Sequence, residues 1–410
     1  MKVCQINYSD IDGGAARAAY RIHHALRRSG VDSTMMVNVA FSGDWTVQGP
    51  KSLVAKLLNR MRPQISTVAR SLFRTANPII HSPAILPSFW PRRLNASNAD
   101  VLHLHWVAGE MMSIADIARL NKPIVWTLHD MWTFCGAEHY TDDVRWREGY
   151  RKDNRPAHEA GFDLNRWTWI RKQKHWRHPM HMVTPSQWLA DCVRDSALMR
   201  EWPVSVVPNP IDTDRWQPID QALARKLLGL PQNIPLVLFG ALGGGRDPRK
   251  GFDLLLKSFA HLRGDNPALD LVVFGQLAPR NPPDLGFPIH YTGHLHDDLS
   301  LRVLYSAADL LVIPSRQDNL PNTGVEAYAC GTPVVAFNTG GLPDIVDHKR
   351  TGYLAEAFDV VDLAHGIKWV LANAETAALS KNAREHAIAK FSYPVVARQY
   401  KKIYETIEGK

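Results

Sequence analysis

The chain has no long apolar run and few cysteines. None of its apolar runs approaches the roughly 18–20 residues that a helix needs to cross a bilayer. The first residues, MKVCQINYSD, lack the apolar stretch of a signal peptide and predict a strand instead. The four cysteines, at positions 4, 135, 192 and 330, are far apart and lack metal-ligand spacing. They predict free thiols in a reducing compartment, so the expected location is the cytoplasm.

Acidic residues are missing from one long stretch. Between Trp45 and Ala99 there is no Asp or Glu, whereas bases are frequent. These bases are Lys51, Lys56, Arg60, Arg62, Arg70, Arg74, Arg92 and Arg93. The net charge of +8 is uneven as well, since residues 1–205 hold 27 Lys and Arg against 18 Asp and Glu, while residues 206–410 hold 21 against 22.

Apolar residues are interleaved with these bases at helical spacing. They recur every three or four positions at Leu53, Leu57, Met61, Ile65, Val68 and Leu72. The pattern predicts a basic amphipathic helical segment that is broken at Pro63. Such a segment within residues 51–93 fits an anionic membrane surface, and it fits equally a surface helix with a solvated basic face. No nucleic-acid-binding module is legible, so nucleic acid is not an expected partner.

The length of 410 residues exceeds one ordinary core and predicts two domains. Short buried-strand patterns alternate with amphipathic helices in both halves, as in KVCQINY followed by RAAYRIHHALRRSG. This alternation predicts an α/β fold with two doubly wound parallel sheets that face each other.

The stretch Pro314–Pro333, PSRQDNLPNTGVEAYACGTP, is the most informative part of the chain. It follows the strand pattern DLLVIPS and holds Asp318 and Glu326, eight positions apart, around a turn-rich loop. Open α/β sheets bind ligands at such loops, between the carboxyl end of a strand and the start of a helix. The N–H groups of the helix end suit phosphate, and a carboxylate accepts hydrogen bonds from ribose hydroxyls. The alternative is a capped loop with two solvated acids.

This stretch resembles the acid-x7-acid signature of retaining glycosyltransferases of family 4, which have the GT-B fold. The first acid of the family is usually Glu, and here it is Asp318, as in a subset of the family. The resemblance covers most of the chain, and GGAA, WTLHD-x-W and QDNLPN are similar to exopolysaccharide and O-antigen transferases. It implies an acceptor-binding domain at residues 1–207, a donor-binding domain at 208–385, and a last helix within 386–410 that crosses back onto the first domain.

Two glycine-containing loops extend the resemblance. Gly13 and Gly14 lie between the first strand and the first helix, where glycines allow backbone N–H groups to approach a phosphate closely, although a glycine pair is also common in ordinary turns. The loop after LVLFGAL carries Arg246 and Lys250, which match the Arg and Lys that the family uses for the diphosphate. Arg249 is a rival to Arg246, and the alternative for the whole loop is a solvated basic turn.

The resemblance also assigns roles to individual side chains. His129, at the end of the strand pattern IVWTLHD, matches a family histidine that touches the transferred sugar. Glu326 would hold the ribose, and Asp318 would hold the sugar hydroxyls together with the backbone of Asn319 and Leu320. His103, like His105, is nearer the middle of its strand and is interpreted as a buried, hydrogen-bonded histidine.

Asp212 and Asp214 spell the D-x-D of metal-dependent glycosyltransferases of the other major fold. They follow PNPI at the expected domain linker, which indicates a turn. We therefore expect no metal and no cofactor.

The expected activity is transfer of a sugar, with retention, from a UDP-, GDP- or similar nucleotide sugar to a saccharide or lipid-linked saccharide. A role in bacterial surface polysaccharide synthesis at the inner membrane face follows from the basic charge and the resemblance. Two alternatives remain, a nucleotide-sugar epimerase of the same fold and a non-catalytic binding protein. The sequence does not identify the base, the sugar, the acceptor or the linkage.

Overall fold

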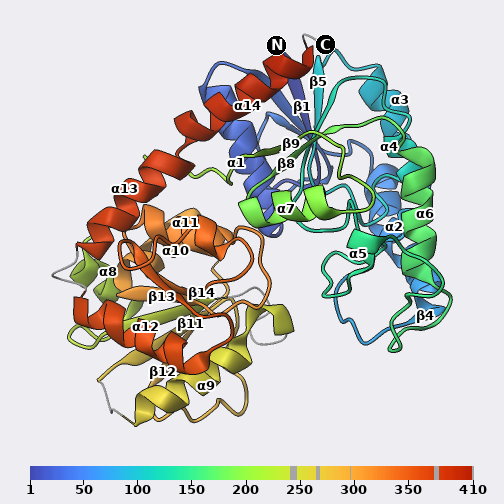
Figure 1. Ribbon diagram of the computed structural model, residues 1–410. Coiled ribbons are helices and arrows are strands. Elements are labelled where there is room, and N and C mark those ends of the chain that lie inside the picture. Colours follow the sequence, from blue (N-terminus) through green and yellow to red (C-terminus); the bar gives the residue numbers. More distant parts are fainter. Residues whose placement is uncertain (241–246, 265–267, 296, 374–377, 409–410) are drawn as a thin grey trace. The chain divides into compact units, whose positions relative to one another are not determined.

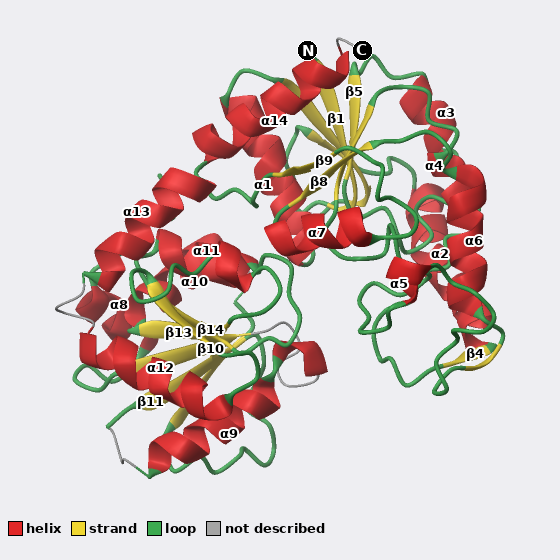
Figure 2. Cartoon of the chain, viewed as in Figure 1, coloured by secondary structure: helices red, strands yellow, loops and turns green. Residues whose placement is uncertain are grey.

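The computed structural model describes the chain apart from residues 241–246, 265–267, 296, 374–377 and 409–410. The chain divides into two compact units (Figure 1): unit 1 is Met1–Val207 with Val396–Lys410, and unit 2 is Pro208–Val395. In each unit the strands lie in the middle and helices cover them (Figure 2). The predicted class, α/β with two doubly wound parallel sheets and a last helix on the first of them, is confirmed.

Unit 1 is built on a parallel sheet. In its described residues, seven strands lie in the order β3-β2-β1-β5-β6-β8-β9. They are β1 (Lys2–Ser9), β2 (Asp32–Val39), β3 (Val47–Gln48), β5 (Val101–Leu104), β6 (Ile124–Thr127), β8 (His181–Thr184) and β9 (Val204–Val206). The chain leaves β1 towards β2 and later returns on the other side, at β5. The carboxyl ends of β1 and β5 therefore flank a switch point, where open α/β sheets bind ligands.

Alternate side chains of this sheet enter separate cores. Val3 and Val101 pack with α1 and α14 on one face, whereas Cys4 and Leu102, one residue further along, pack with helices of the other face. The helices of the first face are α1 (Gly14–Arg28) and α14 (Tyr393–Glu408), and those of the second are α3 (Trp90–Asn95), α4 (Ile114–Ile117), α5 (Arg145–Glu148), α6 (Leu164–His175) and α7 (Gln187–Asp195). A period of two with both sides apolar is the pattern of a strand that is covered on both faces.

Unit 2 repeats this plan. Six parallel strands of its described residues lie in the order β12-β11-β10-β13-β14-β15, so its switch point lies between β10 and β13. They are β10 (Leu236–Gly240), β11 (Asp270–Phe274), β12 (Ile289–Gly293), β13 (Leu310–Ile313), β14 (Val334–Phe337) and β15 (Gly352–Ala355). One face packs on α8 (Gln221–Leu228), α10 (Asp298–Ala307), α11 (Asn322–Ala329) and α13 (Leu379–Phe391), and the other on α9 (Phe252–Arg263) and α12 (Val360–Asn373).

The basic segment of unit 1 forms a helix, α2 (Leu53–Ser71), which is followed by a short antiparallel pair of β4 (Phe73–Arg74) and β7 (Ala160–Gly161). The predicted break at Pro63 is wrong, because the helix continues through this proline. A proline removes one backbone donor, and on a largely exposed helix water can hydrogen-bond the carbonyl that loses its partner.

All four cysteines are free, as predicted, and all four are buried. In the described part of the chain, no helix has both the length and the hydrophobicity needed to cross a membrane.

Candidate functional site

Three loops of unit 2 meet at the carboxyl edge of its sheet. They follow β10, β13 and β14, which are neighbours in the sheet, so both sides of the switch point contribute. The first loop carries Lys250, the second Asp318 and the third Gly341. The backbone joins them, because Arg316 donates its N–H to the Arg249 carbonyl at 2.7 Å, and Gly341 donates to the Asp318 carbonyl at 2.9 Å. Lys250 and Asp318 therefore lie on one edge.

An ion pair links the first two loops. Lys250 Nζ lies 2.6 Å from Asp318 Oδ2, and Ser315 Oγ donates to the same oxygen at 3.3 Å. The Lys250 side chain is 27% exposed and the Asp318 side chain 10%, so Lys250 is the more exposed partner. Gly251 allows the loops to approach, because it has φ +64° and a Cβ there would overlap the carbonyl oxygen of Pro314.

The third loop supports the Asp318 backbone. Gly340 has φ +57°, and a Cβ on it would lie only 2.5 Å from the Asp318 carbonyl oxygen. The remaining carboxylate oxygen of Asp318, Oδ1, accepts the N–H of Asn319 at 3.1 Å. Both carboxylate oxygens thus have protein donors, and the orientation of the carboxylate is set before any ligand binds.

The second acid lies on the helix that follows. Glu326 is buried in α11, and its Oε2 accepts the Tyr305 hydroxyl at 3.0 Å. The residue that caps α11, Pro321, gives no side-chain hydrogen bond to the helix, so the N–H groups at the amino end depend on other acceptors. Before it, Leu320 is buried and its carbonyl accepts Asn209 Nδ2 at 3.2 Å.

Two arginines, Arg246 and its rival Arg249, are candidates for the diphosphate. Arg246 lies outside the described residues. Its rival Arg249 lies in the turn Pro248–Lys250 and pairs with Asp247, with Nη2 and Oδ2 2.6 Å apart. Lys250 and Arg249 are thus both paired with a carboxylate, but only the partner of Lys250, Asp318, is itself a predicted ligand residue.

In unit 1, the loop after β1 opens onto α1. Gly13 caps this helix with φ +92°, and a Cβ on it would meet nothing within 4 Å, so there is open space beside the first helical turn, which starts at Gly14. Asp10 fixes the neighbouring backbone, because its carboxylate accepts the N–H groups of Phe41 and Ser42 at 3.0 and 2.8 Å. The first turn of α1 is thus placed beside the switch point of its sheet.

His129 lies two residues beyond β6 and is partly exposed. Its Nε2 lies 3.2 Å from Nδ1 of His105, with the two rings stacked, and its carbonyl accepts the Tyr140 hydroxyl at 3.2 Å. Desolvation lowers the pKa of His129 to about 4, although the charge of Asp130 acts in the opposite direction. The imidazole is therefore neutral at pH 7.

His103 and His105 are buried and hydrogen-bonded, as predicted, but they are not in the middle of a strand, because β5 ends at Leu104. His105 Nε2 lies 2.7 Å from Gln5 Oε1, and His103 Nε2 lies 2.7 Å from Thr127 Oγ1. His103 Nδ1 lies 2.6 Å from the hydroxyl of Tyr404, which belongs to α14. Burial holds the pKa of His103 and of His105 well below 6.5.

With the Gln5 amide oxygen facing His105, the network assigns the proton of His129 to one of its two nitrogens. The Gln5 amide oxygen faces His105 and can only accept, so His105 donates through Nε2–H. A neutral imidazole has one N–H, so His105 Nδ1 is an acceptor and His129 Nε2 donates to it. His129 Nδ1 is then left as an acceptor nitrogen on a partly exposed side chain, suited to a hydroxyl donor.

An aspartate–histidine pair beside His129, formed by Asp130 and His139, was not predicted. Asp130 Oδ2 lies 2.6 Å from His139 Nδ1 and accepts Trp106 Nε1 at 3.0 Å. Burial alone would raise the pKa of Asp130, but the charge and hydrogen bond of His139 outweigh it, and the pKa is lowered. The only sequence signal was a polar stretch at 136–166 that follows a strand end.

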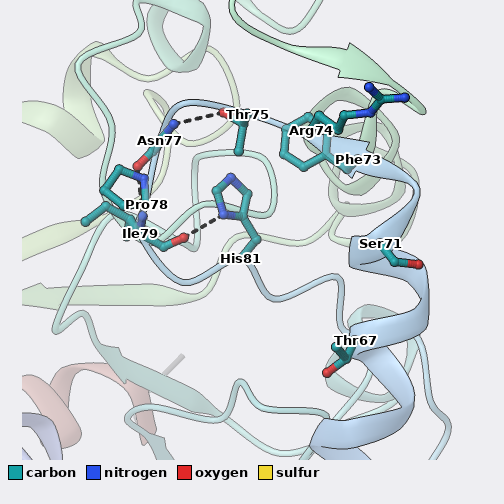
Figure 3. A pocket seen from close by; sticks show the side chains of 9 residues that line it. All are labelled: Thr67, Ser71, Phe73, Arg74, Thr75, Asn77, Pro78, Ile79 and His81. Atoms are coloured by element: carbon teal, nitrogen blue, oxygen red, sulfur yellow. Dashed lines mark hydrogen bonds between the residues drawn. The ribbon is translucent and has the colours of Figure 1, made fainter.

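Unit 1 also contains a pocket of about 530 Å³ at the carboxyl end of α2 (Figure 3). It is lined by Thr67, Ser71, Phe73, Arg74, Thr75, Asn77, Pro78, Ile79 and His81. The Phe73 and His81 rings lie 5.3 Å apart, and Asn77 Nδ2 donates to the Tyr140 carbonyl at 3.0 Å. Since the Tyr140 hydroxyl donates to the His129 carbonyl, two hydrogen bonds connect the pocket wall to His129.

The D-x-D residues lie in a turn. Asp212 is buried, and its Oδ1 accepts the N–H groups of Asp214 and Arg215 at 3.3 and 3.4 Å. Among the described residues, no group of three or more His, Cys, Asp or Glu side chains is placed to hold a metal ion.

Two family models match the chain. The model described as "Glycosyltransferase Family 4" matches residues 12–215, and the one described as "Glycosyl transferases group 1" matches residues 236–373. A curated relative, D-inositol 3-phosphate glycosyltransferase of Geodermatophilus obscurus, is 37% identical over 198 residues, which are 44% of this chain and 43% of the relative. The chain spans about half the length of the curated relatives it matches.

Solved structures share the fold over the whole chain. Sucrose-phosphate synthase from Thermosynechococcus elongatus has a TM-score of 0.65 at 18% identity, with 100% of both chains covered. HepE of Anabaena in complex with UDP-glucose has a TM-score of 0.62 at 17% identity, with 99% of this chain and 100% of that chain covered. At these identities the likeness concerns the fold alone.

Proposed function

The chain belongs to glycosyltransferase family 4, with the GT-B fold, and on this premise we propose that it transfers a sugar from a nucleotide diphosphate sugar to a hydroxyl of a saccharide acceptor. The anomeric configuration is retained, and the sugar is a hexose. The role is in bacterial surface polysaccharide synthesis.

One observation carries this proposal. An accessible ammonium, an oriented carboxylate and a helix amino end meet at the switch point of unit 2, from loops that are neighbours in the sheet. A nucleotide diphosphate sugar needs these groups together: a cation for the diphosphate, acceptors for the sugar hydroxyls and backbone donors for phosphate oxygens.

The donor lies mainly on unit 2. Lys250 and Arg246 hold the diphosphate, Glu326 accepts the ribose hydroxyls, and Asp318 with the backbone of Asn319 and Leu320 holds the sugar. The Lys250–Asp318 pair supports this arrangement, since the ammonium that meets the diphosphate also fixes the acid that meets the sugar. The UDP-glucose in the HepE structure favours a uridine nucleotide as the first donor to test.

Unit 1 contributes neutral hydrogen-bonding groups. Gly13 and Gly14 bring backbone N–H groups near the donor phosphate, and His129 accepts a hydroxyl of the transferred sugar through Nδ1. A neutral histidine suits this role because it does not add a charge that would compete with Lys250 for the diphosphate.

The transfer needs no protein nucleophile and no metal. The acceptor oxygen forms the new bond to the anomeric carbon on the face from which the diphosphate departs, and the leaving phosphate oxygen takes the acceptor proton. The protein supplies orientation, and the cations at the diphosphate stabilise the departing charge.

The acceptor lies on unit 1, in the pocket at the end of α2. Hydroxyls, an amide, a guanidinium and the Phe73 ring are the kinds of groups that bind sugars, and the pocket wall is hydrogen-bonded towards His129. The acceptor is a saccharide, free or linked to a lipid, and the enzyme meets it on the cytoplasmic side of an anionic membrane surface. The basic excess of the first half supports this location.

A donor screen tests the proposal. The full chain is incubated with UDP- and GDP-sugars, with and without a mixture of saccharide and lipid-linked saccharide acceptors, and products are identified by mass spectrometry. Donor consumption that requires an acceptor and yields a larger glycan supports transfer. Conversion of the donor without acceptor would instead support an epimerase, and stabilisation by a nucleotide sugar without turnover would support a binding protein.

A further inference from the structure

Helix α2 exposes an apolar face to solvent. Its outward side chains are 49–82% exposed, and they are Leu53, Val54, Leu57, Leu58, Met61 and Ile65. A surface helix normally turns its apolar stripe inward. At about 100° per residue these six side chains cover one side of the helix, so they form a continuous apolar face.

The opposite side of α2 attaches the helix to unit 1 through polar groups. Arg62 donates through Nε to the Glu110 carbonyl and through Nη2 to the Leu86 carbonyl, both at 2.7 Å. Asn59 Nδ2 donates to the Asn38 carbonyl at 3.3 Å, and Ser66 is buried. The helix is therefore anchored by its polar side, and its apolar face does not contribute to the described core of this unit.

The charged residues of the segment that carries the apolar face have one sign. Lys51, Lys56 and Arg60 are exposed, and no acid occurs between Trp45 and Ala99. Two copies of this face would bring like charges together, whereas an anionic surface would neutralise them. An apolar face flanked by cations is the arrangement of helices that lie in the plane of a membrane interface.

We propose that α2 docks unit 1 on an anionic lipid bilayer, with its apolar face in the interface and Lys51, Lys56 and Arg60 against the headgroups. Arg62 takes no part, because it faces the protein. The purpose of docking rests on the proposed function: the same helix lines the sugar pocket with Thr67 and Ser71, so a lipid-linked acceptor would reach the pocket from the surface on which α2 lies (Figure 3). The binding itself is independent of sugar transfer.

Vesicle co-sedimentation of the full chain tests the proposal. With phosphatidylglycerol/phosphatidylcholine vesicles at low salt the protein sediments, and high salt or pure phosphatidylcholine lowers the bound-to-free ratio by about tenfold or more. The double variant K56E/R60E lowers it by about tenfold or more as well, and so does the triple variant L57S/L58S/M61S. The matched control K226E/K257E makes the same change in net charge on exposed residues of unit 2 and retains binding.

A fluorescent label locates the contact. Because the four native cysteines are buried, an environment-sensitive dye can be attached selectively to Leu58→Cys, and its emission should shift to the blue with anionic vesicles. The same dye on Lys226→Cys should not shift. Binding that ignores lipid charge, survives in both α2 variants, or leaves the Leu58→Cys dye in water would overturn the proposal, as would self-association through α2 without vesicle binding. Unchanged nucleotide binding in the α2 variants separates this outcome from a failure of the proposed function.

Discussion

The two sheets present different chemistry at their carboxyl edges. In unit 2 the edge holds ionised groups near the surface, with Lys250 paired to Asp318 across two loops. In unit 1 the edge holds His129, a neutral imidazole whose proton is assigned by Gln5 through His105. The ionic edge suits a charged diphosphate, and the neutral edge suits sugar hydroxyls. Under the proposed function, the charge of the diphosphate and the hydroxyls of the sugar would be bound by different parts of the chain.

The largest expected difference between the two units is in their stability at acidic pH. The folded-state pKa of His23 is about 3 and that of His129 about 4, so the unfolded chain binds more protons than the folded chain below pH 6.5. Each of these two histidines therefore lowers the free energy of unfolding by about 2 kcal/mol between pH 7 and pH 5. His103 and His105 act in the same direction, whereas Glu110 and Glu138, whose pKa values burial raises, act against it and reduce the net loss.

Hydrogen exchange followed by mass spectrometry at pH 7 and pH 5 measures the loss of stability in each unit, once the rates are corrected for intrinsic exchange. Peptides of unit 1 should lose protection at pH 5 while those of unit 2 largely keep it. Equal loss in both units would show that the buried histidines do not control acid stability.

Lys250→Met should have the next largest effect. It removes the cation that we propose for the diphosphate and leaves Asp318 without its ion-pair partner, so kcat should fall by about 10²–10³-fold. Arg249→Met is the matched control in the same turn, because the carboxylate that pairs with Arg249 belongs to Asp247, which is not a predicted ligand residue, and it should change kcat by less than about threefold. Similar losses in both variants would remove the distinction between these two cations.

The two acids should separate binding from turnover. Glu326→Gln should weaken a nucleotide diphosphate sugar and the free nucleotide diphosphate together, by about tenfold, because ribose contacts persist in both. Asp318→Asn should lower kcat more than nucleotide affinity, because Asp318 is proposed to hold the sugar hydroxyls. Calorimetry and steady-state kinetics on the same preparations decide this, and an Asp318→Asn enzyme with full turnover would show that the site is wrongly assigned.

The neutral edge can be altered through Gln5 without touching His129. Gln5→Leu releases His105 to carry its proton on Nδ1, which moves the proton of His129 from Nε2 to Nδ1 and should lower kcat by about tenfold. Gln5→Glu keeps an acceptor and should keep the tautomer. Long-range ¹H–¹⁵N NMR of the labelled ring, assigned with His129→Asn, reports it, and an unchanged His129 tautomer in Gln5→Leu would contradict the network.

Removal of divalent metal should have the smallest effect. Lys250 and Arg246 are proposed to take the place of a cation at the diphosphate, so excess EDTA should change the rate by less than about twofold. If EDTA abolishes activity and magnesium or manganese restores it, Asp212 and Asp214 become the residues to examine.

The parts predicted from sequence are those whose signals are local. Asp318, Glu326 and Lys250 lie in short motifs beside strand patterns, and the periodicity of two and the alternation of strand and helix predict both sheets. The other residues of the candidate site are brought together by contacts between parts of the chain that are far apart in the sequence. Gln5 and His105 are 100 residues apart, and no local pattern predicts that they meet.

A count of charges in the sequence also does not show which charged side chains are buried or which way a helix faces. Lys172 is fully buried and donates to the carbonyls of Cys135 and Gly136, at 3.1 and 2.7 Å. It therefore counts towards the basic excess of the first half, but it is not on the surface where a binding partner would meet it. In α2 the helical spacing was predicted, but not that the apolar face is the one left in solvent, because orientation depends on Arg62 and its carbonyl partners. The continuation through Pro63 was missed for a related reason, since the cost of a proline depends on exposure.

Titration calorimetry with nucleoside diphosphates tests the central claim most directly, namely that the switch point of unit 2 binds the donor. The full chain is titrated with UDP, GDP, ADP and dTDP, and then the Lys250→Met and Glu326→Gln variants with whichever binds. The account predicts that the chain binds at least one of them and that both variants weaken it by about tenfold or more. If none binds, or if the two variants bind as the unaltered chain does, the donor site is not at this edge.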